Sequence, residues 1–138
     1  MKIDSGKVSE YALATALLSR DIVPLWPSSA HLKYDIVVVP RKGVTRRIQV
    51  KGLSTTQTSS ISVKIRHNQH ASGGKKVSRK YTKEDVDIIV IHLIHLSVFY
   101  IIPIGCLNGQ GAITIKPEDP KCRWKRYQEA WKYLGVIE

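Results

Sequence analysis

The sequence is poor in cysteine, with only Cys106 and Cys122 among its 138 residues. Two cysteines are too few for a disulfide scaffold of this length, and the absence of a C-x-x-C pair excludes a zinc ribbon. No apolar segment follows Met1, so we expect no secretory signal and a reducing, cytoplasmic setting. The composition is ordinary for a globular protein and the length suits one core, so we expect a single domain over residues 1–138.

Apolar runs long enough to cross a membrane are also missing. The longest candidate, residues 88–104, contains His92, His95 and Pro103. A span needs about 20 apolar residues, and histidines near its middle would be costly. We therefore expect two buried strands, over 86–93 and 97–102. A phosphate loop with a Gly-Lys signature is absent as well, so a nucleotide triphosphatase is not supported.

Acidic residues are absent from one long segment. No Asp or Glu lies between Asp35 and Glu84, and these 48 residues hold 12 Lys and Arg. The other 90 residues hold 10 basic and 11 acidic residues, so this segment carries the whole excess behind the net charge of +11. Such a concentration suits a polyanion, because neutralised phosphates release condensed counterions. A solvated basic surface is the alternative, and an anionic membrane is less favoured because no basic amphipathic helix accompanies the charge.

A nucleic acid is therefore the expected partner. The basic residues expected to contact it are Arg46, Arg47, Lys64, Arg66, Lys75, Lys76, Arg79 and Lys80.

The hydrophobic pattern predicts an α/β fold, a central mixed β-sheet flanked by helices. Residues 7–20 are expected to form the first helix, with Ser5 as a possible N-cap, and a last helix is expected over 117–134. Its aromatic residues Trp124, Tyr127 and Trp131 are read as core. Residues 67–83 are expected to form a loop and 108–112 a Gly-rich turn. The remaining strands are expected over 22–26, 33–39, 44–52 and 61–66.

Three side chains on two neighbouring strands could perform chemistry. If strands 33–39 and 44–52 pair through a turn near Gly43, Asp35 comes close to Gln49 and Lys51, which share one face. A carboxylate binds a hard divalent cation, an amide oxygen binds it more weakly, and the Val50 carbonyl could add a ligand. A lysine beside them could serve a water molecule and offset phosphate charge. The spacing alone is a weak signal, because such residues are common on exposed strands.

Two other sets of side chains are weaker candidates. His67 and His70 lack a clear third metal ligand, which favours phosphate contact or solvation. Cys106 and Cys122 lack an identifiable base and are interpreted as structural thiols.

The arrangement resembles the PD-(D/E)XK nuclease superfamily, in which an Asp on one strand and an acidic residue plus Lys on the next follow a helix bearing Glu. The matching residues are Glu10, Asp35, Gln49 and Lys51, with Gln49 in place of the acid and Tyr34 in place of the motif's proline. Further matching segments extend the resemblance over roughly residues 6–134: Asp85-Val86-Asp87, 98–103 and 126–131. More narrowly, the chain looks like the group I intron-associated homing endonucleases.

The resemblance implies a restriction-endonuclease-like core and Mg²⁺-dependent hydrolysis of phosphodiesters in double-stranded DNA, with Mn²⁺ able to substitute. Asp35 would be the central metal ligand, Glu10 an auxiliary one, Gln49 a weak ligand or water-positioning group, and Lys51 the residue serving the nucleophilic water.

A homing enzyme must read a long site, and a short chain offers limited surface. We therefore expect a homo-oligomer, a dimer or tetramer. The alternatives are a structure-selective nuclease like a Holliday junction resolvase, and a non-catalytic DNA-binding module. The second alternative stays open because Gln49 replaces the acidic residue of the motif.

Overall fold

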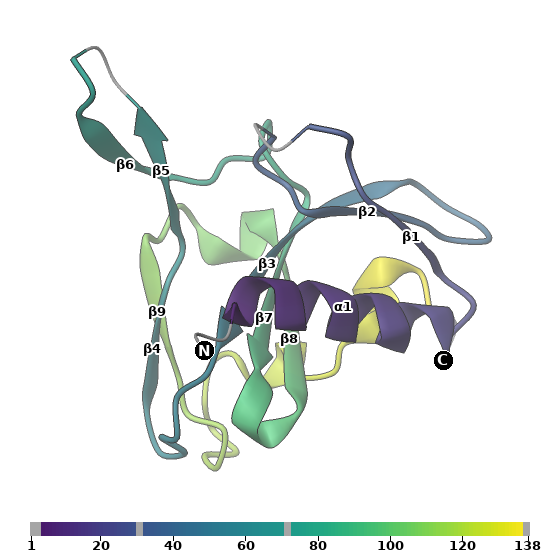
Figure 1. Ribbon diagram of the computed structural model, residues 1–138. Coiled ribbons are helices and arrows are strands. Elements are labelled where there is room, and N and C mark those ends of the chain that lie inside the picture. The colour runs from purple at the N-terminus through teal and green to yellow at the C-terminus, as the bar shows by residue number, and fades with distance from the viewer. Residues whose placement is uncertain (1–3, 30–31, 71–72, 137–138) are drawn as a thin grey trace.

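The fold is built on a five-stranded mixed sheet. The computed structural model describes residues 4–29, 32–70 and 73–136. The strands lie in the order β1-β2-β3-β7-β8, with β3 and β7 parallel and the other pairs antiparallel (Figure 1). Their bounds are Val23–Leu25, Ile36–Val39, Arg46–Leu53, Ile88–Leu93 and Val98–Pro103. The predicted α/β class with a mixed central sheet is confirmed, and Pro24 lies in the edge strand β1, where its missing N–H is tolerated.

Helix α1, Ser5–Leu18, covers one face of this sheet (Figure 1). Leu13 and Leu17 are fully buried and pack against apolar side chains of the strands, including Ile48 and Val90. Asp4, and not Ser5, is the N-cap, because its carboxylate accepts a hydrogen bond from the Lys7 backbone N–H at 3.1 Å.

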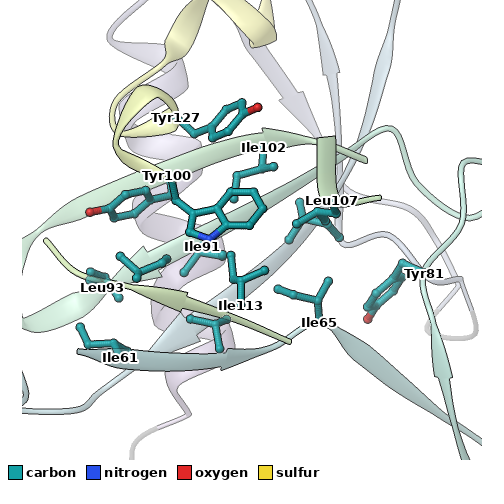
Figure 2. Close-up of a cluster of buried hydrophobic side chains, with 14 of the residues drawn as sticks. Ile61, Ile65, Tyr81, Ile91, Leu93, Tyr100, Ile102, Leu107, Ile113 and Tyr127 are labelled. Carbon is teal, nitrogen blue, oxygen red and sulfur yellow. The ribbon is translucent and has the colours of Figure 1, made fainter. Parts of the chain in front are cut away.

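The opposite face is covered by a small second sheet. Strands β4, Ile61–Lys64, and β9, Ala112–Ile115, pair antiparallel. Figure 2 shows Ile61, Ile65 and Ile113 packed beside Ile91 and Leu93 of the central sheet. All six residues of β7 are buried, because alternate side chains enter the two cores. The long apolar run is thus two strands, β7 and β8, as predicted, joined by a short 3₁₀ turn over Ile94–Leu96. None of the helices in the described ranges is long and apolar enough to cross a membrane.

The predicted last helix over 117–134 is wrong. The structure has two short 3₁₀ turns there, Lys125–Tyr127 and Trp131–Leu134. Glu129 takes a left-handed φ of 53°, and its backbone N–H donates to the Phe99 carbonyl at 2.7 Å. The backbone here therefore bonds to β8 instead of forming the hydrogen bonds of a helix. The aromatic residues are buried as predicted, but α1 is the one α-helix in the described part of the chain, so a sheet and 3₁₀ turns replace the expected second helical layer.

The predicted loop over 67–83 is also wrong. Strands β5, Arg66–His70, and β6, Lys76–Lys80, pair antiparallel as a separate two-stranded ribbon, which projects from the body in Figure 1. Pattern analysis missed it because the ribbon lacks the alternating apolar residues that mark a half-buried strand.

Gly52 allows α1 to lie directly on β3. A Cβ atom at this position would lie 2.1 Å from Ser9 Oγ and 2.5 Å from the Ser5 carbonyl oxygen. We expect Gly52→Ala to lower the free energy of unfolding by about 3 kcal/mol, because a backbone atom cannot rotate out of the way. Chemical denaturation measures this change. Gly105→Ala is the matched control, since its Cβ would meet no atom within 4 Å, and an equal loss there would contradict the steric explanation.

Candidate active site

Asp35 is fixed at the start of β2 by the backbone of β3. Its N–H donates to the Ile48 carbonyl at 2.8 Å, and its Oδ2 accepts from the Val50 N–H at 3.0 Å. Since Ile36 pairs with Ile48 in the antiparallel β2–β3 ladder, Asp35 lies beside Gln49 at the next register position. The strand pairing predicted from the sequence therefore forms and brings Asp35 to the segment 49–51.

Glu10 approaches Asp35 from the helix. Both side chains line one cleft of about 360 Å³, together with Lys7 and Tyr34. Glu10 is only 9 % exposed, and Lys7 Nζ lies 3.7 Å from Glu10 Oε2. Burial raises the pKa of the Glu10 carboxyl, and the nearby charge of Asp35 raises it further.

The ionised form of Asp35 is also disfavoured by its surroundings. Burial raises the pKa of its carboxyl, although the hydrogen bond from Val50 and the charges of Lys51 and Lys7 act in the opposite direction. Two partly desolvated carboxylates that share a cleft repel one another, and a bound cation would relieve both costs.

Lys51 of β3 interacts electrostatically with Asp35. Its Nζ donates to the Arg66 carbonyl at 3.2 Å and stands 5.1 Å above the ring of Tyr81. Burial lowers the pKa of the Lys51 ammonium; the charge of Asp35 opposes this shift, and that of Lys64 adds to it. A lysine in this setting releases a proton more readily than a solvated one, which suits a group that serves a reacting water.

Gln49 lies in β3 opposite Asp35 and is half-buried. Its Nε2 donates to the Val50 carbonyl at 3.3 Å. The amide therefore contacts the carbonyl that was predicted as an additional ligand. The side-chain oxygen of Gln49 and the carbonyl oxygen of Val50 both belong to the segment of β3 that Asp35 contacts.

The available donors at this site are oxygen atoms, which suit a hard cation. In the described ranges no three His, Cys, Asp or Glu side chains gather into a metal site. The candidates are two carboxylates, an amide oxygen and the Val50 carbonyl, and oxygen ligands of this kind are those that Mg²⁺ and Mn²⁺ take. The residues therefore fit the cation that the sequence analysis predicted. His67 instead lies 4.8 Å from the ring of Tyr81, and the side chain of His70 lies outside the described part of the chain.

Sequence analysis missed Tyr81 and Lys7 at this site. Burial raises the pKa of the Tyr81 hydroxyl, with Asp35 contributing, so the ring stays neutral beside Lys51. The i,i+3 spacing of Lys7 and Glu10 was a signal for the ion pair. No sequence signal pointed to Tyr81, because only the fold brings it close to Lys51 of β3.

Two of the basic residues predicted to contact DNA are engaged within the protein. Arg47 contacts Asp87 at 3.2 Å and donates to the carbonyls of Lys83 and Glu84. Arg66 donates to the side chain and the carbonyl of Ser78. These contacts give both arginines a structural role.

The remaining predicted DNA contacts lie on the sheet and the ribbon. Lys64, Lys75, Arg79 and Lys80 are exposed, Arg46 is half-buried, and the side chain of Lys76 is outside the described set. Arg66, Arg79 and Lys80 line a second, larger cleft of about 620 Å³ together with Lys33 and His67. Among the described residues its lining is predominantly basic, with Asp85 as the single acidic one.

Comparisons with known proteins give a matching family and a similar fold. A family model described as PD-(D/E)XK endonuclease matches residues 2–134. Among solved structures, the bacterial homing endonuclease I-Ssp6803I superposes with a TM-score of 0.78 at 24 % sequence identity, over 94 % of this chain and 90 % of that one. At that identity the likeness establishes a shared fold. No curated protein matches the chain.

Proposed function

The chain belongs to the PD-(D/E)XK endonuclease family, and from this premise we propose that it is a divalent-metal-dependent, site-specific DNA endonuclease of the homing type. The observation that carries the proposal is the cleft that Glu10 and Asp35 share, with the partly buried ammonium of Lys51 close enough to Asp35 to interact with its charge. Similarity in fold to a bacterial homing endonuclease supports the narrower class.

The residues of the site would have separate roles in the reaction. Asp35 and Glu10 would hold Mg²⁺ or Mn²⁺, assisted by Gln49 and the Val50 carbonyl. When bound, such a cation supplies Lewis-acid stabilisation of the charge that develops on the phosphate. Lys51 would orient the attacking water and take up or return its proton, because burial lowers the pKa of its ammonium and so favours the neutral amine. Water adds to phosphorus, and the bond from phosphorus to the leaving sugar oxygen breaks.

The β5–β6 ribbon would contact the DNA. Its backbone is tied to the site, because Lys51 Nζ donates to the carbonyl of Arg66 in β5. Its two strands carry exposed Arg79 and Lys80 and no acidic residue. A two-stranded ribbon fits the major groove of B-DNA, which is about 12 Å wide.

A homo-oligomer is the second part of the proposal. Val23 and Leu25 on edge strand β1 are about half exposed, and exposed Trp26 lies 5.9 Å from the ring of exposed Tyr11. Apolar side chains gathered at a sheet edge favour burial against another chain. A second copy there would present two basic ribbons to one duplex. Light scattering of the purified protein should give a multiple of the monomer mass, and a monomer at working concentration would contradict this part.

The direct test of the function is cleavage of supercoiled plasmid and of a synthetic four-way junction, with Mg²⁺ or with EDTA. We expect Mg²⁺-dependent cuts at discrete plasmid positions and none with EDTA. Selective cutting of the junction would instead favour a structure-selective nuclease. Binding without cutting of either substrate would favour the non-catalytic module.

Gln49 offers a separate test of the cation site. Gln49→Glu adds a carboxylate beside Asp35, and we expect it to tighten Mg²⁺ or Mn²⁺ binding at neutral pH by roughly tenfold, because hard cations favour carboxylate oxygen. Calorimetric titration measures the affinity. Gln49→Ala should slow cleavage by removing a positioned polar group.

Gln57→Glu is the matched control for Gln49→Glu, because it adds the same charge at an exposed position. Equal tightening by both variants would point to general electrostatics and away from ligation by residue 49.

A further inference from the structure

The N-terminal half of α1 is attached to the sheet by a buried polar contact. Ser9 is fully buried, and its Oγ lies 2.7 Å from Nδ1 of His92, which is only 5 % exposed. The His92 ring also stacks on Phe99, with centroids 4.4 Å apart and planes 9° from parallel. Burial lowers the pKa of His92, so the ring is neutral and keeps one nitrogen free to accept a hydrogen bond.

The partners of Ser9 lie in one row across the sheet. Gly52 of β3 pairs with His92 of β7, which pairs with Phe99 of β8. Gly52 has no side chain, so Ser9 lies directly on its backbone and reaches the histidine beyond it. The row thus combines close packing with one hydrogen bond.

This contact differs in kind from the rest of the helix interface. Leu13 and Leu17, further along α1, are held by apolar packing, which has no directional requirement and tolerates small slides and rotations. A short buried hydrogen bond has a steep dependence on distance and angle. It therefore sets the rotation of the first turns of α1 more tightly than the leucines do.

Glu10 directly follows Ser9 and reaches the cleft of Asp35 from this same turn. A change in the rotation of Ser9 would move the Glu10 carboxylate away from Asp35. We propose that the Ser9–His92 hydrogen bond, seated on Gly52, positions Glu10 as a ligand of the divalent cation. Ser9 and His92 are then positioning residues, as are groups that orient a metal ligand from outside the coordination sphere. The inference rests on the proposed cation site.

The test is a double-mutant cycle on metal affinity, read by calorimetric titration of Mn²⁺ into the full chain without DNA. Ser9→Ala should weaken Mn²⁺ binding roughly tenfold, and Glu10→Gln should weaken it as well. The double variant should bind no more weakly than Glu10→Gln alone, because Ser9 acts through Glu10. Additive losses, or wild-type affinity in Ser9→Ala, would overturn the proposal.

Two further variants separate positioning from general loss of stability. Leu17→Val loosens the far end of α1 and should lower the melting temperature while leaving Mn²⁺ affinity unchanged. If Ser9→Ala does not fold, His92→Phe serves in its place, because it removes the partner of Ser9 and keeps a ring that can stack on Phe99; it should weaken Mn²⁺ binding about as much, and wild-type affinity there would overturn the proposal. His92→Asn is its conservative counterpart, because the side-chain amide can still bond Ser9 near the Nδ1 position, so it should retain most of the affinity.

The outcome for the wild type separates this inference from the proposed function. Wild-type protein that binds no Mn²⁺ would overturn both. Wild-type binding that is unaffected by the loss of Ser9 Oγ would overturn the positioning role alone.

Discussion

Asp35→Asn is expected to slow DNA cleavage at least about a thousandfold, which corresponds to about 4 kcal/mol of transition-state stabilisation. The amide keeps the shape of the side chain and can still accept the hydrogen bond from Val50 N–H. It removes the charge that would hold the cation. DNA binding should stay close to that of the wild type, because losing a negative charge near phosphates does not weaken attraction.

The same substitution should stabilise the protein. The folded-state pKa of Asp35 is raised above its ordinary value, so the folded state binds the carboxyl proton more tightly than the unfolded chain does. Stability is then lost as pH rises through the interval between the unfolded and folded pKa values, and the full cost is present at neutral pH. Asn carries no such cost, so Asp35→Asn should melt higher at pH 7, by roughly 4 °C for each kcal/mol. The gain should disappear below about pH 4.

Melting curves of both proteins across this pH range, together with single-turnover cleavage, check the prediction. Glu118→Gln is the control, because it removes one charge from an exposed side chain and should change neither property. Cleavage by Asp35→Asn near the wild-type rate would show that the cation site lies elsewhere. A melting temperature that falls equally at every pH would show that the buried charge has no net cost.

Replacing Lys75, Arg79 and Lys80 together by Ala is the second change with a large expected effect. All three side chains are exposed, and the last two line the larger basic cleft. If each neutralises one phosphate, the slope of log K against log salt should fall by roughly 0.9 per residue in B-DNA. Affinity at low salt should fall for every sequence tested. Fluorescence anisotropy on a random-sequence duplex over a salt series measures both quantities.

A matched triple variant distinguishes local contact from net charge. Lys116, Lys121 and Lys132 are exposed and lie outside the acid-free segment, so their replacement by Ala removes the same charge elsewhere. We expect its salt slope to stay near that of the wild type. Equal slopes for the two triple variants would mean that the ribbon points away from the duplex and that its charge serves solubility.

Several features of this protein were determined by the sequence alone. The acid-free segment is a property of the residue order and needs no fold. The proximity of Asp35 to residues 49–51 followed from two neighbouring strands joined by a short turn, since strand pairing and the two-residue period fix both distance and face. The apolar run over β7 and β8 was read correctly because strands buried on both faces lose their alternation.

Other predictions failed where local pattern and tertiary contact conflict. Residues 117–134 have apolar side chains at helical spacing, yet Glu129 and Gln128 pair with β8 and break the helix. Strands β5 and β6 have no apolar face, so their pairing leaves no periodic trace in the sequence. Arg47 is basic like its neighbours, but only the fold brings Asp87 to its guanidinium.

The assembly of the candidate site was decided by tertiary structure. Glu10 lies 25 residues before Asp35, and no local rule brings a helix carboxylate to a strand end at that separation. It arrives there because Gly52 lets the first turns of α1 lie against β3, where Ser9 contacts His92 of β7. Tyr81 likewise reaches Lys51 only through the folded chain. Residue types and strand periodicity thus determined which groups could react. Long-range packing determined which of them meet and how burial and neighbouring charges shift their pKa values.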